Sequence, residues 1–407
     1  MRIIAIHRYF WPDSPPYASF LRRIAGRWAE DGHQVEVLAG RPSYESARSR
    51  AGAAELVDGF RIRRIPVLRD LSGGWRQLIN LVAFPVFVSV RILLARSPDV
   101  VMCSTVPQVT LGWAVSVATR VRRGAFVYHC MDLHPEIGRI SGEFRNPLLY
   151  RVLAQLDLAT MRRAERIVVL SEDMRRAVLS RDPRLEGRVI VLNNWALPDF
   201  GEPEASPLPP PAEGVLRVVF TGNLGRFQGL EQVVSALAFL PPHVRIEVVF
   251  MGEGRAKSDV EQATRLLEAP GIDVLFLPAG SASAAKALMR TAHLGLVTLV
   301  PGVVRYAYPS KTATYISQGL PLLVLCEQDS ALAQSVTRLG LGWSVAAGDQ
   351  RGLVRALEEA CQRLAEDGLA SEREAVTRWS RGSFNESRVL QRWSEMLFDS
   401  VRGTVEA

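Results

Sequence analysis

The first forty residues alternate in a way that a parallel sheet explains best. An apolar run at residues 3–6 precedes a helical pattern over residues 18–31, which a glycine at position 32 closes, and a β-branched run follows at residues 34–38. Two apolar strands joined by a helix form a βαβ unit, whose strands are parallel. The sequence therefore predicts an α/β fold with helices on the faces of its sheet.

The same alternation begins again after a proline-rich segment. Residues 203–212 contain five prolines, which excludes both a helix interior and a central strand and predicts a linker. A strand at 215–220, a glycine-bearing turn at 221–229 and a helix at 230–240 then follow. Further strands are predicted at 100–103, 125–129, 167–170, 189–192, 245–251, 274–277, 294–298 and 321–325.

These patterns predict two Rossmann-like domains that face each other across a cleft. The expected parts are an N-terminal domain, the linker, a C-terminal domain and a final helix that packs back toward the first domain. Their predicted bounds are 1–200, 201–213, 214–380 and 381–407.

Charge is unevenly divided between the two halves. The net charge is +7, of which residues 1–200 carry +10 and the remainder −3. This asymmetry predicts an anionic partner for the first domain, although a soluble arginine-rich surface explains it as well. The four cysteines have no metal-ligand spacing, which is typical of a reducing compartment, and residues 1–6 resemble a strand rather than a signal peptide.

One strongly apolar segment, residues 78–90, interrupts the alternation. It is too short to span a bilayer, which takes about 20 apolar residues. It is either a helix packed on the sheet or one that dips into a membrane surface, where Arg69, Arg76 and Arg91 would meet anionic headgroups. The basic charge of this half favours membrane contact through residues 75–91.

Two loops of the second half are suited to anions. After the strand at 215–220, glycines let the backbone approach a phosphate, and an arginine adds charge; the loop contains Gly222, Asn223, Gly225, Arg226, Gln228 and Gly229. The spacing is not that of a dinucleotide fingerprint. After the strand at 294–298, Arg305 and Lys311 could face a diphosphate. The hydroxyls of Ser310, Thr312 and Thr314 could bind a ribose or a phosphate. The alternative is that this segment is simply the polar start of a helix.

A third polar segment follows the strand at 125–129. His129, Asp132 and His134 could supply an acid or base near a sugar. No further imidazole or cysteine has matching spacing, so we expect no metal there. In the first domain the stiff, aromatic loop at residues 9–17 is expected either to line an acceptor site, through Trp11, Asp13 and Tyr17, or to be purely structural.

Taken in order, these motifs resemble those of the retaining GT-B glycosyltransferases of family 4, in the branch that assembles bacterial polysaccharide and lipopolysaccharide. The resemblance covers nearly the whole chain and rests on six segments: residues 9–13, 32–35, 132–136, 194–195, 222–230 and 308–312. It implies that the C-terminal domain holds the nucleotide diphosphate and the N-terminal domain the acceptor. It also implies that the leaving phosphate takes the proton of the acceptor.

The sequence departs from the family pattern at its best-known positions. Two glutamates that many members carry eight positions apart correspond here to Tyr306 and Thr314, and the usual Arg and Lys of the phosphate loop to Asn223 and Gln228. Other members with the Pro-Ser-Lys sequence share these changes. The resemblance thus implies a donor site made of both loops, Tyr306 and Glu253, with the phosphates held by Arg226, Lys311 and loop backbone.

The resulting hypothesis is a retaining, metal-independent hexosyl- or N-acetylhexosaminyltransferase that needs no cofactor. Its donor is expected to be a UDP-sugar, and its acceptor a membrane glycolipid or a polyprenyl-diphosphate-linked intermediate, with no nucleic acid as partner. The protein would lie in the cytoplasm, peripherally on the inner face of the cytoplasmic membrane. The alternatives are a non-hydrolysing sugar-nucleotide 2-epimerase and a catalytically silent sugar-nucleotide-binding subunit.

Overall fold

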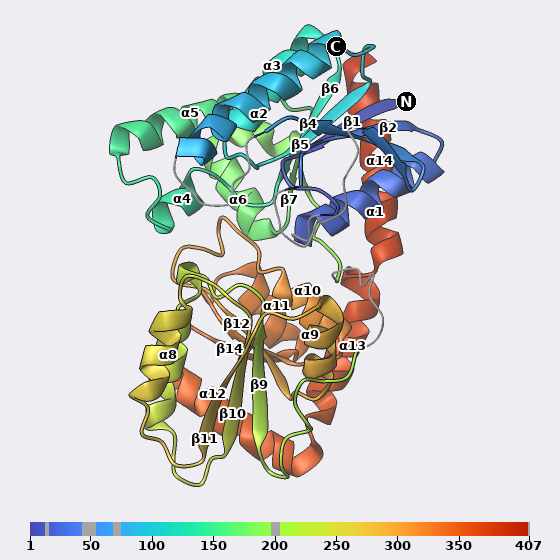
Figure 1. Ribbon diagram of the computed structural model, residues 1–407. Helices are drawn as coiled ribbons and strands as arrows, with labels where there is room; N and C mark the ends of the chain where they lie inside the picture. The colour runs from blue at the N-terminus through green and yellow to red at the C-terminus, as the bar shows by residue number, and fades with distance from the viewer. Residues whose placement is uncertain (13–15, 43–53, 68–74, 197–203, 406–407) are drawn as a thin grey trace. The chain divides into compact units, whose positions relative to one another are not determined.

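The computed structural model describes residues 1–12, 16–42, 54–67, 75–196 and 204–405. The chain forms two compact units, each built on a parallel sheet (Figure 1), which confirms the predicted α/β class. Unit 1 comprises Met1–Asn194, Tyr306–Tyr308 and Glu386–Ala407, and unit 2 comprises Trp195–Arg305 and Pro309–Asn385.

Unit 1 contains an eight-stranded sheet in the order β3-β4-β2-β1-β5-β6-β7-β8. All neighbouring strands are parallel except β3 and β4, which form an antiparallel hairpin at one edge. The central strands are buried along almost their whole length, as expected for a sheet covered on both faces. The strands are β1 (Arg2–His7), β2 (Gln34–Gly40), β3 (Ala54–Val57), β4 (Phe60–Ile65), β5 (Val100–Ser104), β6 (Ala125–Cys130), β7 (Arg166–Val169) and β8 (Val189–Val191).

The helices of unit 1 cover both faces of this sheet. In Figure 1 the helices α2, α3 and α5 lie together on one face, and α1 lies beside α14 on the other. Their bounds are α1 (Pro16–Glu30), α2 (Trp75–Leu94), α3 (Thr110–Val121), α4 (Glu136–Ile140), α5 (Pro147–Arg163), α6 (Glu172–Arg181) and α14 (Glu386–Val405).

The last helix of the chain, α14, completes the core of unit 1. Trp393 is 1% exposed and lies edge-on to Trp28 of α1 and to His129 of β6. Polar contacts tie the helix to both ends of the unit: Ser394 donates to Asp31 at 2.5 Å, and an Arg392 guanidinium donates to the Val191 carbonyl at 3.0 Å. The N-terminal sheet is therefore built from two distant parts of the sequence.

Unit 2 is a six-stranded, wholly parallel sheet in the order β11-β10-β9-β12-β13-β14. Counted within the unit, this is the doubly wound order 3-2-1-4-5-6, which reverses direction between β9 and β12. The strands are β9 (Leu216–Thr221), β10 (Ile246–Met251), β11 (Ile272–Leu277), β12 (Leu294–Thr298), β13 (Leu322–Leu325) and β14 (Gly342–Val345).

Helices on both faces of this sheet and a segment of the predicted linker complete unit 2. The helices are α7 (Leu230–Ala236), α8 (Lys257–Arg265), α9 (Ala282–Arg290), α10 (Lys311–Ser317), α11 (Ala331–Leu339), α12 (Gln350–Asp367) and α13 (Ala370–Ser383). The proline-rich segment runs over this unit: the Arg217 guanidinium donates to the Pro209 carbonyl at 2.7 Å, and the Glu204 amide donates to Ser283 at 3.1 Å.

Candidate active site

The strand order of unit 2 indicates where a ligand binds. In a doubly wound sheet, ligands occupy the crevice beyond the carboxyl ends of the strands, where the order reverses. Here that position lies beyond Thr221 of β9 and Thr298 of β12. Both anion loops predicted from the sequence begin at these two strand ends.

The first loop needs glycine because backbone packs directly on backbone. Gly222 has φ 103°, a conformation that favours glycine. A Cβ placed on Gly252, which follows β10, would lie 2.0 Å from the Gly222 carbonyl oxygen. The loop after β9 can therefore rest on the loop after β10 and leave its outer side open.

Lys311 brings a positive charge to this glycine. Its ammonium would lie 3.7 Å from a Cβ on Gly222 and is 4.3 Å from the centre of the Phe220 ring. Burial lowers the pKa of Lys311 to about 8. In the part of the chain that the structure describes, no carboxylate pairs with this lysine. A half-buried cation without an anionic partner is suited to an anionic ligand.

Tyr315 positions the helix that carries Lys311. Its ring fits over Gly295 of β12, where a Cβ would lie 2.5 Å from the ring, and its hydroxyl accepts a hydrogen bond of 3.0 Å from the Thr221 amide. Burial raises the pKa of Tyr315 to about 12, so the hydroxyl stays protonated. The helix α10 is thereby attached to the two strands at which the order reverses.

Three buried polar atoms near this edge have no hydrogen-bond partner. They are the hydroxyl oxygens of Thr312 and Thr314, both on α10, and Oε2 of Glu327, which follows β13. The other carboxylate oxygen of Glu327 accepts from the Gly302 amide. Unsatisfied buried polar groups are rare and costly in native proteins, so groups gathered at a sheet edge are candidates to bind a ligand's hydroxyls.

Other predicted donor residues make contacts within the protein or lie exposed around the two loops. The Gln228 side chain accepts from the Gly225 amide at 2.9 Å, which holds the turn before α7, while Gly229 at φ 62° begins that helix. Glu253 is exposed and pairs with Lys257 at 2.7 Å, and Arg305 lies 3.8 Å from Asp329. The side chains of Asn223, Arg226 and Ser310 are also exposed.

In unit 1, the segment after β6 carries the predicted acid–base group. The backbone of Asp132 forms a bridge with Ala307, and the Leu133 amide donates to the Tyr306 carbonyl at 2.7 Å. Burial raises the pKa of Asp132 to about 6. Tyr306 therefore packs with unit 1, and its predicted role in donor binding remains a prediction.

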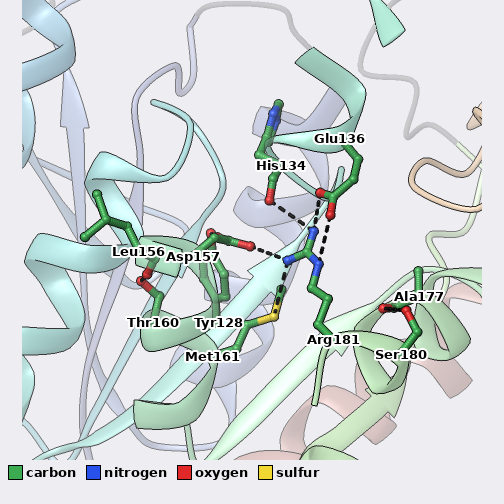
Figure 2. Close-up of polar contacts among 10 residues, drawn as sticks. All are labelled: Tyr128, His134, Glu136, Leu156, Asp157, Thr160, Met161, Ala177, Ser180 and Arg181. Atoms are coloured by element: carbon green, nitrogen blue, oxygen red, sulfur yellow. Dashed lines mark hydrogen bonds and ion pairs between the residues drawn. The ribbon is translucent and has the colours of Figure 1, made fainter. Parts of the chain in front are cut away.

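An ion network holds the same segment in place (Figure 2). Arg181, at the end of α6, donates to Asp157 of α5 at 2.6 Å, to both carboxylate oxygens of Glu136 and to the His134 carbonyl at 3.1 Å. Tyr128 donates to the other oxygen of Asp157 at 2.8 Å. Although burial alone would lower the pKa of Arg181, the two carboxylates raise it above its ordinary value. Glu136 is thus committed to a structural pair.

The two histidines of this segment differ in their surroundings. His129 is 0% exposed; its Nδ1 lies 2.8 Å from the Tyr17 hydroxyl and its Nε2 has no partner. Burial lowers its pKa to about 3, so it is neutral at neutral pH. His134 is 6% exposed, and burial, assisted by the charge of Arg181, lowers its pKa to about 4. These placements favour a positioning role for His129 over direct contact with substrate.

The predicted acceptor residues lie at the beginning of the chain. Tyr17 is buried against His129 and His7, at ring-centre distances of 5.2 and 4.4 Å. The Arg22 guanidinium lies 4.9 Å above the ring of Trp11. Asp13 lies outside the described residues. Tyr17 therefore supports the loop from inside, while Trp11 is less buried.

Sequence reasoning missed three residues of these sites: Asp157, Arg181 and Glu327. An aspartate between leucines in an amphipathic helix was a usable signal for the first, because a buried carboxylate needs a partner. Nothing in the local sequence singled out Arg181 among many arginines. Glu327 directly follows a predicted buried strand, which is the position where ligand-binding side chains occur in such sheets.

The described residues contain neither a metal-binding cluster nor a membrane-spanning helix. No group of three His, Cys, Asp or Glu side chains gathers there as a metal site requires. Over the same ranges, no helix combines the length and apolar character needed to cross a bilayer. The helix α2 has Phe84, Val88 and Ile92 in the core, yet its outer side is also apolar.

Comparison with known proteins agrees with this architecture. Residues 17–195 match the family model described as a glycosyl transferase 4-like domain. The probable glycosyltransferase WbjE of Pseudomonas aeruginosa is 26% identical over 316 residues, which are 74% of this chain and 75% of that protein. The structure of Anabaena Alr3699/HepE in complex with UDP-glucose is similar at a TM-score of 0.69 and 14% identity, over 98% of this chain and 99% of that chain. The structure of sucrose-phosphate synthase from Thermosynechococcus elongatus is similar at a TM-score of 0.69 and 15% identity, over 97% of this chain and 98% of that chain.

The two sheets and the likeness to these solved structures show that the chain has a GT-B fold. The family match over residues 17–195 and the WbjE relative support a glycosyltransferase and agree with the family 4 resemblance of the sequence motifs.

Proposed function

We propose that the protein transfers a sugar from a nucleoside diphosphate donor, with retention of anomeric configuration, to a membrane glycolipid or polyprenyl-diphosphate-linked acceptor. The observation that carries this proposal is Lys311 beside Gly222, an ammonium group without a carboxylate partner at the switch point of unit 2. Solved neighbours that contain UDP or UDP-glucose support a UDP-sugar as the donor.

The chemistry follows from where charge develops. As the glycosidic bond lengthens, negative charge builds on the departing diphosphate, and a preorganised cation stabilises it. Lys311 supplies that cation, Gly222 lets the phosphates approach the backbone, and Arg226 adds charge from the exposed side of the loop. The hydroxyls of Thr312 and Thr314 take the place of the family's glutamates toward the sugar nucleotide. The departing phosphate accepts the acceptor's proton, so neither a metal ion nor a cofactor is needed.

The acceptor belongs to unit 1 in this proposal. Asp132, whose pKa burial raises to about 6, is mainly ionised at neutral pH and accepts a hydrogen bond from a substrate hydroxyl. The Arg181 network keeps the Asp132–Glu136 segment rigid. The apolar outer side of α2 brings the protein to the inner face of the cytoplasmic membrane, where a lipid-linked acceptor is available.

The test begins with the donor. A panel of UDP-, GDP- and dTDP-sugars is screened by melting shift, and the best ligand is then incubated with protein and a bacterial lipid extract. We expect labelled sugar in the lipid phase and, by NMR, an unchanged anomeric configuration in the product. Inverted product would refute retention, and no melting shift with any nucleotide would refute the proposed donor site.

The same assay separates the alternatives. A 2-epimerase would convert the donor without any acceptor, and a silent binding subunit would show the melting shift but never release nucleoside diphosphate. The family match and the glycosyltransferase relative favour transfer over both.

A further inference from the structure

A cavity lies at the amino ends of the unit 1 strands, at the edge of the sheet opposite to the one that carries Asp132. It has a volume of about 660 Å³ and is lined by the first residues of β1 and β2, by β4 and by the end of α2. Four arginines line it: Arg2, Arg61, Arg91 and Arg96. The residues named above for donor binding, acceptor binding or catalysis are not among those that line it.

The charges around this cavity are poorly balanced. Glu36 is the carboxylate among its lining residues, and it is shared by Arg63 at 2.9 Å and Arg91 at 3.8 Å. The Arg91 Nε is buried without a hydrogen-bond partner. Burial lowers the pKa of His33, so this ring is neutral at neutral pH. Asp99, which adjoins the cavity, accepts from the Arg2 amide at 2.7 Å. The cavity therefore has a surplus of positive charge.

The end of a helix normally repels anions because its last carbonyls carry partial negative charge. At the end of α2 this effect is offset. The Arg122 guanidinium donates to the Ala95 carbonyl at 2.9 Å and to Ser97 at 3.3 Å. A fifth arginine thus covers the carbonyl end of the helix next to the cavity, which leaves the surplus guanidinium charge for a ligand.

An exposed apolar surface adjoins this basic cavity. Along α2 the exposed side chains recur at helical spacing: Ile79 43%, Val82 61%, Val86 51%, Val90 46% and Leu94 75%. The neighbouring helix α3 continues the surface with Trp113 at 41%, Val117 at 36% and Val121 at 66% exposure. Neither α2 nor α3 contains an acidic residue. An apolar surface of this kind, bordered by arginines, complements a bilayer with anionic headgroups.

We propose that the arginine-lined cavity binds the phosphate headgroup of an anionic phospholipid, while the outer sides of α2 and α3 lie in the adjoining acyl region. The charge surplus selects the headgroup, and the apolar side chains select a lipid over a free phosphate. This inference rests on the proposed function in one respect: a lipid-linked acceptor requires the protein to work at a membrane.

The placement of the cavity has a mechanical consequence within unit 1. The helix α2 follows the carboxyl end of β4 and precedes the amino end of β5, so it runs from the edge with Asp132 to the edge with the cavity. A helix of 20 residues is about 30 Å long. A headgroup bound at the far end would fix the whole length of α2 against the bilayer and hold the Asp132 edge near the membrane surface.

The test is binding of the full-length protein to vesicles, measured by flotation without donor or acceptor. We expect binding to phosphatidylcholine vesicles that contain phosphatidylglycerol and little binding to phosphatidylcholine alone. Each basic residue near an anionic surface contributes to binding, so the double variant Arg61→Ala/Arg96→Ala should bind roughly thirtyfold more weakly. A matched control, Arg338→Ala/Arg355→Ala on exposed positions of unit 2, loses the same charge and should bind like the unchanged protein.

A second pair of variants tests the apolar surface. Val82→Glu/Val86→Glu should abolish vesicle binding with an unchanged melting temperature, because both side chains are exposed. Equal weakening by the two arginine pairs would overturn the proposal, since net charge alone would then explain binding. The proposal would also be overturned if the protein bound inorganic phosphate but not vesicles. It would likewise be overturned if the protein formed a dimer that only the Val82→Glu/Val86→Glu variant dissociates, because the apolar surface would then be a protein interface. Donor-induced melting shifts are measured in parallel, so a failure here is distinguishable from failure of the proposed function.

Discussion

Among the described residues, one largely buried cation in each unit, Arg181 and Lys311, can be compared by its partners. Arg181 in unit 1 contacts Asp157, Glu136 and the His134 carbonyl, and its carboxylate partners raise its pKa. Lys311 in unit 2 has its ammonium over the Phe220 ring and beside Gly222, pairs with no carboxylate of the described residues, and has a pKa that burial lowers to about 8. A buried charge whose partners come from the fold serves the fold, whereas one left without them is prepared for a ligand.

The largest effect should come from removing Arg181, the cation that has carboxylate partners. Arg181→Met leaves two largely buried carboxylates, those of Asp157 and Glu136, without their cation, which is expected to lower the free energy of unfolding by about 3–5 kcal/mol. Urea unfolding followed by circular dichroism measures this. Arg184→Met, which removes an exposed arginine nearby, should leave the urea midpoint unchanged. Equal midpoints for both variants would mean that the Arg181 network is not structural.

Removing Lys311, which pairs with no carboxylate of the described residues, should affect activity and not stability. Lys311→Ala is expected to leave the melting temperature unchanged or raise it, yet lower turnover roughly a hundred- to a thousandfold, because charge on the departing diphosphate loses its stabilising partner. Lys286→Ala on α9 serves as the control for loss of a lysine. Turnover that survives Lys311→Ala would show that another cation fills this role.

The lowered pKa of Lys311 predicts a pH dependence of ligand binding. The ammonium is charged below its pKa of about 8 and neutral above it, so affinity for a nucleoside diphosphate should be full near pH 7 and fall roughly tenfold by pH 9. Isothermal titration calorimetry measures the affinity at each pH. Lys311→Arg keeps its charge throughout this range, and its affinity should not decline; a parallel decline would assign the titration to another group.

The smallest effect concerns Glu327, whose Oε2 is buried without a partner. Glu327→Gln keeps an acceptor for the Gly302 amide but removes the charge, so affinity for the sugar nucleotide should fall roughly fivefold if this oxygen accepts a ligand hydroxyl. Affinity for the nucleoside diphosphate alone distinguishes a ribose contact from a sugar contact. If both affinities stay the same, Glu327 serves only the loop at Gly302.

Much of the fold could be predicted because its strands are short, apolar and evenly spaced. The β3–β4 hairpin was missed although it carries a local signal: Asp58 and Gly59, both at positive φ, form a two-residue turn that favours Asp-Gly. The strand β14 was missed because its run of four residues, Gly342–Val345, is too short for its alternating burial to stand out in the sequence. The predicted helix at 230–240 ends earlier as an α-helix, at Ala236, and continues as a 3₁₀ turn.

The candidate site was predictable where position along a strand fixes position in space. Gly222 and Lys311 meet because each follows a strand at which the sheet order reverses, and that order can be inferred from alternation alone. The Arg181–Asp157 pair could not be predicted, because it joins two helices whose facing sides depend on tertiary packing. The same limit applies to Gln228, whose side chain is occupied by the Gly225 amide.

The contribution of α14 to unit 1 has a consequence for biosynthesis. Trp393, Met396 and Leu397 are at most 3% exposed, and they fill the core beside β5 and β6, which were made some 260 to 300 residues earlier. This helix is made after every strand of both units. Unit 2 has all its strands before then, so it can mature first, while unit 1 waits for the synthesis of α14. A nascent chain halted after Asn385 would therefore expose an apolar surface to chaperones.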